Sequence, residues 1–343
     1  MKKQVTLKIN NVTVTVDEGT KVLDAARAAG FDIPTLCYLK DVCNDGSCRV
    51  CVVEIKGMRN LAASCSTVVR DGMEVFTNTP KVRNSRKTTI ELILSNHEKK
   101  CLSCVRNGNC ELSKLSQEYN CDPVAYEGVT NKYELDDNNP YLVRDNNKCI
   151  LCRRCVAVCN KIQGVGVIGP NGRGFNTHIG SAFERSLDKV PCVACGQCIN
   201  VCPVGALTER DNTHEVLDAI ANPDKFVIIG TAPSVRVAVG EEFGYPIGTD
   251  VEGKMVSAIK ALGADKVFDV DMAADMTIME EGYELLSRLK NPNAKLPMIT
   301  SCSPGWIRYI EYYYPELIDH LSTCKSPQQM FGAIMKTYYA EKF

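Results

Sequence analysis

The sequence predicts a multidomain α+β protein in which a cysteine-dense part precedes an α/β layer structure. Two observations support this prediction. Seventeen of the 19 cysteines lie between Cys37 and Cys202, and only Cys302 and Cys324 lie beyond them. After residue 224 the pattern changes, and short apolar runs typical of buried strands alternate with long helical stretches. A chain of 343 residues has room for two or three such domains.

The composition argues against several classes of protein. Lys and Arg (40 residues) nearly balance Asp and Glu (41 residues), and the formal net charge of −1 does not favour binding to nucleic acid or to an anionic membrane. The basic start has no apolar segment behind it, and no apolar run reaches about 18 residues, so we expect no signal peptide and no membrane span. We expect a cytoplasmic protein whose reduced thiols are metal ligands rather than disulfides.

The first predicted domain covers residues 1–80. Residues 4–16 alternate between apolar and polar side chains around an Asn-Asn pair, which predicts a β-hairpin. Residues 21–29 predict a short helix that is capped by Thr20 and ended by Gly30. A hairpin, a helix and then a cysteine-rich loop indicate a small β-grasp ferredoxin-like domain.

Five cysteines in this domain allow two assignments of a [2Fe–2S] cluster. The spacing Cys43-x4-Cys48-x2-Cys51 matches the plant-type pattern. The alternative, which we favour, uses Cys37, Cys48, Cys51 and Cys65. Cys65 lies too close along the chain for a plant-type distal ligand, and Cys37 follows soon after the predicted helix. In that assignment Cys43 is a spare thiol packed near the loop.

The second predicted domain covers residues 81–122, and it begins with a helix. It contains the motif His97-x3-Cys101-x2-Cys104-x5-Cys110. Three cysteines leave a [4Fe–4S] cluster one ligand short, and His97 lies one helical turn before Cys101, so its imidazole can complete the set. A zinc site with three cysteines and one histidine is the alternative. We predict ligation to iron, and a neutral imidazole in place of a thiolate should raise the cluster's potential.

The third predicted domain, residues 139–215, holds two similar cysteine blocks. Each has the spacing C-x2-C-x2-C-x3-C of bacterial two-cluster ferredoxins, in which the fourth cysteine of each block binds the other [4Fe–4S] cluster. Zinc needs only four tetrahedral thiolates and does not call for this spacing. The two predicted ligand sets are Cys149, Cys152, Cys155 and Cys202, and Cys192, Cys195, Cys198 and Cys159.

These sets predict one [2Fe–2S] and three [4Fe–4S] clusters, about 14 irons per chain. Cys121 fits no set, and we interpret it as a buried structural thiol.

The order of the domains resembles the N-terminal part of two families, the large iron–sulfur subunit of respiratory NADH dehydrogenase and the multi-cluster [FeFe]-hydrogenases. No dinucleotide-binding fingerprint occurs, so NAD and flavin would bind elsewhere.

The residues after 224 resemble the hydrogenase family in particular. The last predicted domain, residues 224–343, would be the N-terminal part of the hydrogenase catalytic domain, with buried strands at 226–231, 266–270 and 297–300. In that family the active site is the H-cluster, a [4Fe–4S] cube joined through a cysteine to a di-iron centre. The resembling segments are Ala232–Arg236, Gly240–Gly244, Met279–Glu281, Thr300–Trp306 and Lys325–Gln329.

The resemblance implies roles for individual residues. Cys302 would pass a proton to the di-iron centre, and Glu281, Glu284 and Ser322 would form the rest of the proton relay. Without the resemblance, carboxylates in such a helix would indicate a solvated face. The di-iron pocket would be lined by Ala232, Pro233, Ser234 and Gln328.

Two departures from the family pattern matter. The family often has two adjacent cysteines before the proline, and the second binds the H-cluster cube, but here that position is Ser303. Serine is a poor substitute for a soft thiolate, and we expect Cys324 to supply the missing ligand. The chain also ends at Phe343, before the family's remaining cube ligands. We therefore expect a truncated chain with no hydrogen chemistry of its own, and an exposed edge that is mobile or covered by a partner.

The resemblance implies an iron–sulfur electron relay of an [FeFe]-hydrogenase subunit. Electrons would pass between NAD(H)- or ferredoxin-linked partners and an H-cluster that reversibly reduces protons to dihydrogen, and this H-cluster would be complete only in an intact full-length protein. Expected partners are a flavin- and NAD-binding subunit, a thioredoxin-like [2Fe–2S] subunit and ferredoxin. The alternative is a non-catalytic electron-transfer subunit with a hydrogenase-like scaffold. A zinc-bound structural protein is disfavoured by the ferredoxin repeat.

Overall fold

The computed structural model describes residues 3–300 and 302–342, and the chain divides into two compact units, Met1–Arg210 and Asp211–Phe343. Ser301 of the hydrogenase-like motif lies outside the described residues, as do the ends of the first and last predicted domains. The first unit contains the predicted cluster-binding segments. Within the described part of the chain, no helix is long and apolar enough to cross a membrane.

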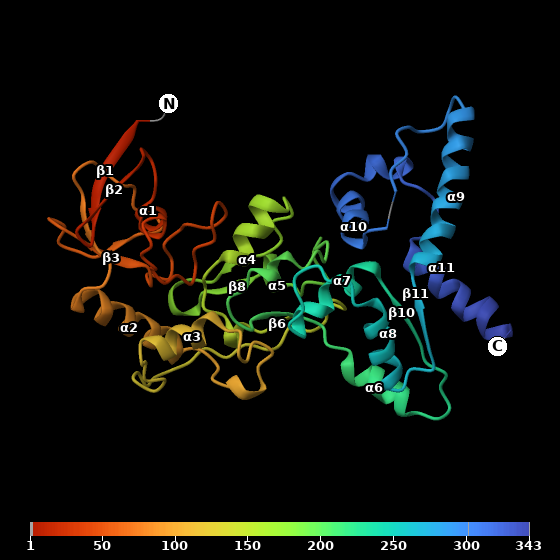
Figure 1. The fold of residues 1–343 in the computed structure, drawn as a ribbon, viewed down its shortest axis with the longest axis horizontal. Coiled ribbons are helices and arrows are strands. Elements are labelled where there is room, and N and C mark those ends of the chain that lie inside the picture. Colours follow the sequence, from red (N-terminus) through yellow and green to blue (C-terminus); the bar gives the residue numbers. More distant parts are fainter. Residues whose placement is uncertain (1–2, 301, 343) are drawn as a thin grey trace. The chain divides into compact units, whose positions relative to one another are not determined.

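A five-stranded sheet opens the first unit (Figure 1). Its strands are β1 (Gln4–Ile9), β2 (Val12–Asp17), β3 (Val52–Ile55), β4 (Ala62–Ala63) and β5 (Glu74–Phe76). The order is β2-β1-β5-β3-β4, with β1 antiparallel to β2 and parallel to β5. The predicted hairpin is present, and its alternation buries Val5, Leu7 and Ile9 on one face.

Helix α1 (Val22–Ala28) packs its apolar residues into the core of this sheet. The prediction that Thr20 caps it is wrong. Lys21 occupies the N-cap position, and its side chain makes no capping hydrogen bond. The Thr20 hydroxyl instead donates to the Asp17 carbonyl oxygen at 2.7 Å. Gly30 lies just beyond the helix with a φ of 82°, a conformation that glycine adopts without strain.

Helix α2 (Pro80–Ser95) connects the sheet to the next segment. Thr79 caps it by accepting a bond from the Val82 N–H at 3.3 Å. The buried Arg86 side chain donates to the Val52 carbonyl oxygen of β3 at 2.8 Å and to the Tyr119 hydroxyl at 3.1 Å. Tyr119 follows helix α3 (Glu111–Glu118), so one side chain joins the sheet, α2 and α3.

The two cysteine blocks contain only short regular elements, because most of the chain there forms loops around the thiols. Helices α4 (Arg154–Ala157) and α5 (Gln197–Asn200) occupy equivalent places in the two blocks. A π-helical turn (Val158–Ile162) follows α4. Two small antiparallel ribbons complete the region, β6 (Leu142–Arg144) with β9 (Leu207–Glu209) and β7 (Gly169–Asn171) with β8 (His178–Gly180).

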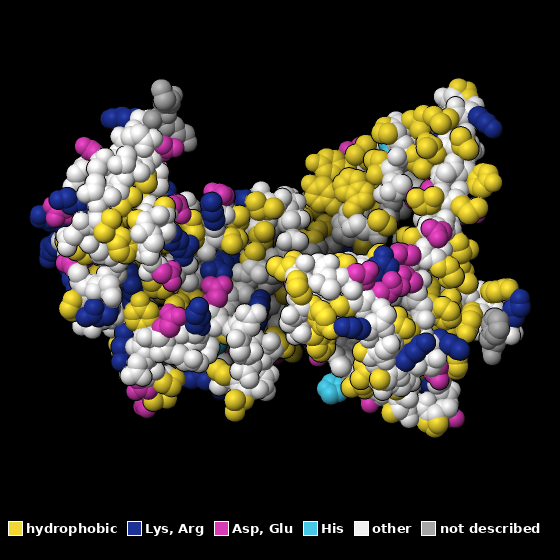
Figure 2. Space-filling model, viewed as in Figure 1, with side chains coloured by type: hydrophobic (Ala, Val, Ile, Leu, Met, Phe, Trp, Pro, Cys, Tyr) yellow, Lys and Arg dark blue, Asp and Glu magenta, His cyan; other side chains and the backbone are white. Residues whose placement is uncertain are grey.

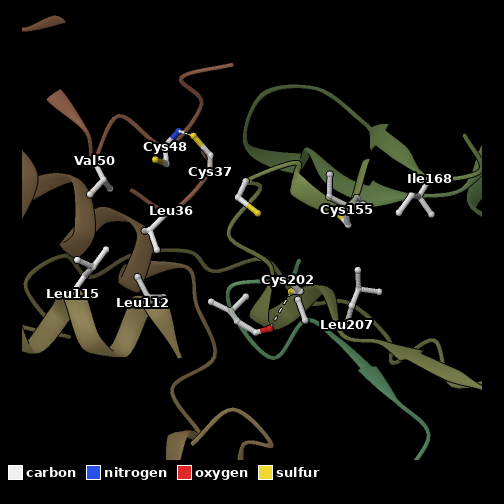
Figure 3. Close-up of a cluster of buried hydrophobic side chains, with 14 of the residues drawn as sticks. Leu36, Cys37, Cys48, Val50, Leu112, Leu115, Cys155, Ile168, Cys202 and Leu207 are labelled. Carbon is white, nitrogen blue, oxygen red and sulfur yellow. Dashed lines mark hydrogen bonds between the residues drawn. The ribbon is translucent and has the colours of Figure 1, made fainter. Parts of the chain in front are cut away.

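In the part of the chain that the structure describes, the first unit has two cores. One lies within the sheet domain and includes Cys51 and Cys65, and the other extends through all three predicted cluster-binding segments (Figure 3). To this second core the sheet domain contributes Leu36 and Val50, α3 contributes Leu112, and β9 contributes Leu207. The buried thiols in this core are those of Cys37, Cys48, Cys152, Cys155 and Cys202.

The second unit is built on two parallel strands, β10 (Ile228–Thr231) and β11 (Lys266–Asp269). The predicted strand at 297–300 is wrong, since Ile299 makes only an isolated parallel bridge to Leu321. The helices are α6 (Thr213–Ala221), α7 (Pro233–Glu242), α8 (Glu252–Ala261), α9 (Asp271–Lys290), α10 (Pro304–Tyr313), α11 (Pro327–Ile334) and α12 (Ala340–Lys342).

Large apolar side chains are exposed along α9, as Figure 2 shows. A helix that exposes apolar residues on several sides is not fully covered by its own unit. The exposed apolar residues of α9 include Met272, Met276, Ile278, Met279, Tyr283, Leu286 and Leu289.

Candidate metal centres

Four buried thiols of the first domain lie together. The sulfurs of Cys51 and Cys65 are 3.4 Å apart. The Cys48 N–H donates to the Cys37 sulfur at 3.5 Å (Figure 3). Hydrogen bonds from the thiols of Cys48 and Cys65 lower the pKa of Cys37 to about 2, and a bond from Cys65 lowers the pKa of Cys51 to about 6. The fold thus favours two thiolates beside two thiols, which suits the binding of a cationic iron centre.

Cys43, the competing ligand, points elsewhere. Its sulfur lies 3.9 Å from a carboxylate oxygen of Asp45 and 4.0 Å from the Cys152 carbonyl oxygen. Burial raises its pKa, which favours the neutral thiol. The structure therefore brings together the set that contains Cys37, and it places Cys43 between that set and the first cysteine block.

The two cysteine blocks produce two thiol-lined cavities, and each cavity holds one crossed set. The cavity with Cys149, Cys152 and Cys155 also contains Cys202, and about 390 Å³ of it is free of protein atoms. The other measures about 450 Å³. Its thiols are those of Cys159, Cys192, Cys195 and Cys198. The exchange of the fourth cysteine that the spacing predicts is thus present as a neighbourhood of side chains.

The backbone within both blocks turns its N–H groups toward sulfur. The Leu151 N–H donates to the Cys149 sulfur at 3.4 Å. Leu151 (φ 54°) and Arg153 (φ 63°) are left-handed, and so are Ala194 (φ 53°) and Gly196 (φ 73°) at the matching positions. Each non-glycine residue there costs about 1–2 kcal/mol. Such strain concentrates at functional sites, and loops of this kind form concave binding sites for anions and iron–sulfur centres.

The histidine-containing set has the chemistry of a metal site. The His97 side chain is half-buried, and this burial lowers its pKa, which favours the neutral imidazole. Its Nδ1 is buried without a hydrogen-bond partner among the described residues, which leaves that nitrogen for a metal. Cys101 and Cys104 share one 3₁₀ turn, and the thiols of Cys104 and Cys101 help burial to raise the pKa of Cys110.

This segment packs closely against the end of the second cysteine block. The Arg106 guanidinium donates to the carbonyl oxygens of Cys202 at 3.0 Å and Ile199 at 3.3 Å. A Cβ atom added to Gly205 would lie 2.8 Å from the Cys104 sulfur, closer than atoms tolerate. Gly205 therefore allows the thiol of one predicted set to approach the loop of another.

In the second unit, Glu284 of α9 is the centre of a polar group. Arg288 binds its carboxylate at 2.6 Å, the Ser322 hydroxyl donates to it at 2.9 Å, and the Thr323 N–H donates at 3.0 Å. Burial raises the pKa of Glu284, but Arg288, Ser322 and Thr323 together outweigh burial and lower it. The Cys324 sulfur lies 3.6 Å from the same carboxylate.

The other hydrogenase-like residues of this unit are less enclosed. Cys302 is exposed, and Glu281 is half-buried on α9. Ala232 precedes α7, at the carboxyl end of β10, where open α/β sheets commonly bind ligands. The described contacts thus connect Glu284, Ser322 and Cys324. The expected pocket residues, all of them exposed, are Ala232, Pro233, Ser234 and Gln328.

Sequence reasoning missed four residues of these sites. The partner of Arg288 could have been predicted from the sequence, because Arg288 lies four residues after Glu284 on one helix. The sequence does not reveal the partners of Arg106, Arg154 and Gly205, since each contacts a segment far away in the chain.

Comparison with known families identifies the segments. Residues 2–80 match a 2Fe-2S iron-sulfur cluster binding domain. Residues 86–124 match the NADH-ubiquinone oxidoreductase-G iron-sulfur binding region, and residues 139–208 match the NADH-quinone oxidoreductase subunit 3 ferredoxin-like domain. Residues 225–343 match the iron only hydrogenase large subunit, C-terminal domain. These matches define the class: a multidomain iron–sulfur protein with a hydrogenase-type domain after its cluster-binding domains.

Individual relatives agree with this class. The chain is 49% identical to NADP-reducing hydrogenase subunit HndD of Solidesulfovibrio fructosivorans, over 98% of this chain and 59% of that protein. It is 43% identical to iron hydrogenase 1 of Clostridium pasteurianum, over 97% of this chain and 58% of that protein. The chain is homologous to the iron-only hydrogenases over almost its whole length, and it spans less than two thirds of the length of these two relatives.

A solved structure resembles a large part of the chain. The crystal structure of an NAD+-reducing [NiFe]-hydrogenase in the H2-reduced state contains a chain that is 30% identical, with a TM-score of 0.57. The match covers 61% of this chain and 88% of that chain.

Proposed function

We propose that this chain is the iron–sulfur relay of an [FeFe]-hydrogenase subunit. The crossed pairing of cysteines in two separate cavities is the observation that carries the proposal, because it is the arrangement that two neighbouring cubane clusters require. Bound clusters would supply one-electron storage and transfer. The chain's residues hold the thiols in place, donate backbone N–H groups to sulfur and keep most of the sites away from water.

The ligand assignments follow the sets that the cysteine spacing predicts. We assign the [2Fe–2S] cluster to the set with Cys37 and leave Cys43 as a spare thiol. We assign the histidine-ligated [4Fe–4S] cluster to His97 with Cys101, Cys104 and Cys110. The unpartnered Nδ1 of the neutral His97 ring supports its place in this set. The two remaining [4Fe–4S] clusters take the two crossed sets.

The whole protein's chemistry is part of the same proposal. The relay would serve an H-cluster that reversibly reduces protons to dihydrogen, with Cys302, Glu281, Glu284 and Ser322 moving the proton. The hydrogen bond from Ser322 to Glu284 supports the proposal that these two residues are neighbours in the proton relay. Electrons would come from a flavin- and NAD-binding subunit with a thioredoxin-like [2Fe–2S] subunit, or from ferredoxin, in the reducing cytoplasm.

The experiment that tests this function counts iron and looks for diatomic ligands. After anaerobic reconstitution the chain should bind about 14 irons, the sum for one [2Fe–2S] and three [4Fe–4S] clusters. Infrared spectra of this chain should lack CO and CN⁻ bands, because we expect it to be inactive in hydrogen chemistry by itself. Stoichiometric zinc, or clearly less iron, would contradict the cluster assignment.

A non-catalytic electron-transfer subunit is the second candidate, and Ser303 favours it because a cube ligand is absent there.

We propose that Cys324 supplies this ligand. In the full-length protein, Cys324→Ala should then lose the H-cluster cube and keep the other four clusters. An unchanged iron content and unchanged spectra would contradict the role of Cys324. In that case Cys324 would have only a structural role, through its contact with Glu284.

A further inference from the structure

Arg154 is a buried cation between two predicted cluster ligands. It begins α4 and lies between Cys152 and Cys155 in the sequence, and only 8% of its side chain is exposed. A charged side chain is rarely buried to this degree without a specific partner, because it loses its hydration. Arginine also keeps its charge in proteins, so the positive charge at this place is permanent.

Its partner comes from the histidine-containing segment. The guanidinium binds the Glu111 carboxylate through two bonds, at 2.6 and 2.9 Å. Glu111 directly follows Cys110, and its N–H donates to the Pro203 carbonyl oxygen next to Cys202 at 3.1 Å. Because 45% of the Glu111 side chain is exposed, water screens the carboxylate more than the guanidinium. The pair therefore leaves an excess of positive potential on the buried side.

The third nitrogen of the Arg154 guanidinium, Nε, does not bind Glu111. The Nε–H of Arg154 is buried and has no hydrogen-bond partner among the described residues. The buried Arg86 and Arg144 likewise have Nε–H groups without a partner in the described part of the chain, so this group alone assigns no partner, and only the charge of Arg154 bears on the nearby thiols. Burial lowers the pKa of Arg154, but the bond to Glu111 and the charges of Glu111, Cys152 and Cys37 outweigh burial and raise it. The guanidinium is thus within electrostatic reach of two thiol sets.

We propose that Arg154 is the positioning residue that sets the reduction potentials where three cysteine sets meet. Its guanidinium offsets the charge gained on reduction by the clusters of the Cys37 and Cys152 sets. Through Glu111 it also holds the histidine-containing segment in register. This inference rests on the proposed function, since it requires that the clusters form.

The direction of the effect follows from charge. A cluster becomes more negative when it takes an electron, so a nearby fixed cation stabilises the reduced form and raises the potential. Removing Arg154 should therefore lower the potentials of the two neighbouring clusters, and removing the opposing charge of Glu111 should raise them.

The test is a redox titration of the reconstituted full chain, followed by electron paramagnetic resonance. For Arg154→Gln we expect an unchanged iron content and a downward shift in the midpoint potentials of the [2Fe–2S] cluster and one ferredoxin-type cluster. Arg154→Lys keeps the positive charge, so it should give a smaller shift. Arg173→Gln is the matched control, because it removes the same charge from an exposed side chain that lines neither thiol cavity, and it should shift nothing.

Each result decides a different point. A fully loaded Arg154→Gln variant with unchanged potentials would overturn the inference, as would an equal shift in Arg173→Gln. If Arg154→Gln fails to bind iron, Glu111→Gln decides, since an upward shift supports the inference and any other result overturns it. Failure of the wild-type chain to form clusters would instead refute the proposed function.

Discussion

Cys37 and Cys43 differ in what surrounds their sulfurs, although they lie six residues apart. The Cys37 sulfur accepts bonds within a group of thiols, whereas the Cys43 sulfur faces Asp45 and the Cys152 carbonyl. Spacing alone allowed either thiol as a ligand. The difference between them therefore has to be tested one residue at a time.

Replacing each thiol by serine separates the two assignments. We expect Cys37→Ser to lose about two irons per chain, because the [2Fe–2S] cluster loses a ligand. Cys43→Ser should keep its full iron content. Iron analysis and visible absorption measure both results. Loss of the two-iron signal in Cys43→Ser alone would favour the plant-type assignment instead.

The role of His97 can be tested by adding a thiolate ligand instead of removing one. A thiolate in its place adds a negative charge to the cluster, so we expect His97→Cys to keep the iron and to lower the midpoint potential of one [4Fe–4S] cluster. His97→Ala should lose about four irons per chain. Redox titration and iron analysis measure these outcomes. A fully loaded His97→Cys variant with an unchanged potential would show that His97 is not a ligand.

At the scale of single residues, the sequence predicted what local spacing encodes. The interval between cysteines predicted which thiols could share a centre. The helical turn expected between His97 and Cys101 is absent, because α2 ends at Ser95 and Cys101 begins a separate 3₁₀ turn. The sequence did not reveal Arg154 or Gly205. Their partners lie 43 or more positions away along the chain, and only the folded chain brings them together.

Among the elements, the loop that follows Cys202 is held most closely to another segment. Arg106 and Glu111 bond to its carbonyl groups, and Cys104 lies against Gly205. The loop therefore positions ligands of two predicted clusters at once. A change in its backbone should affect the histidine-containing set even though the mutated residue binds no metal.

Gly205→Ala tests this close approach. The new Cβ would meet the Cys104 sulfur at 2.8 Å, and the resulting shift should cost about 1–3 kcal/mol of unfolding free energy. We also expect lower occupancy of the histidine-ligated cluster. Gly169→Ala is the control, since a Cβ there meets no atom within 4 Å. Denaturant unfolding and iron analysis measure both variants, and equal behaviour would contradict the proposed packing.

Element boundaries show where prediction from sequence failed. The hairpin and helix α2 were predicted because alternation and helical periodicity are strong local signals. The segment 297–300 was predicted as a strand from its apolar run, but its backbone pairs only at Ile299. A short apolar run does not determine its own pairing partner. The Thr20 cap failed because the hydroxyl bonds backward to Asp17 instead.

At the scale of the whole molecule, the first unit has a core in which thiols replace many of the usual aliphatic side chains. The sequence predicted its segments as separate domains but did not reveal this shared core, because contacts between distant segments leave no periodic signal. The second unit has its own core around Ala273, Phe331 and Met335, which contains no predicted cluster ligand. The two units should therefore respond differently when iron is removed.

Removing iron with a chelator after reduction tests this difference. We expect amide hydrogen exchange to become faster across α2, α3 and the two cysteine blocks, because the core there loses its metal-bound thiols. Exchange in β10 and β11 should stay unchanged. Mass spectrometry of peptides measures both regions. Equal loss of protection in both units would contradict this separation of the cores.

The shared thiol core has a consequence for the biosynthesis of the protein. With the proposed clusters, a newly made chain should complete the packing of its first unit only after iron and sulfide have been delivered. Until then its apolar side chains remain accessible to chaperones and proteases. The cellular amount of this protein should thus follow the activity of the cluster-assembly machinery, even when its messenger RNA is constant.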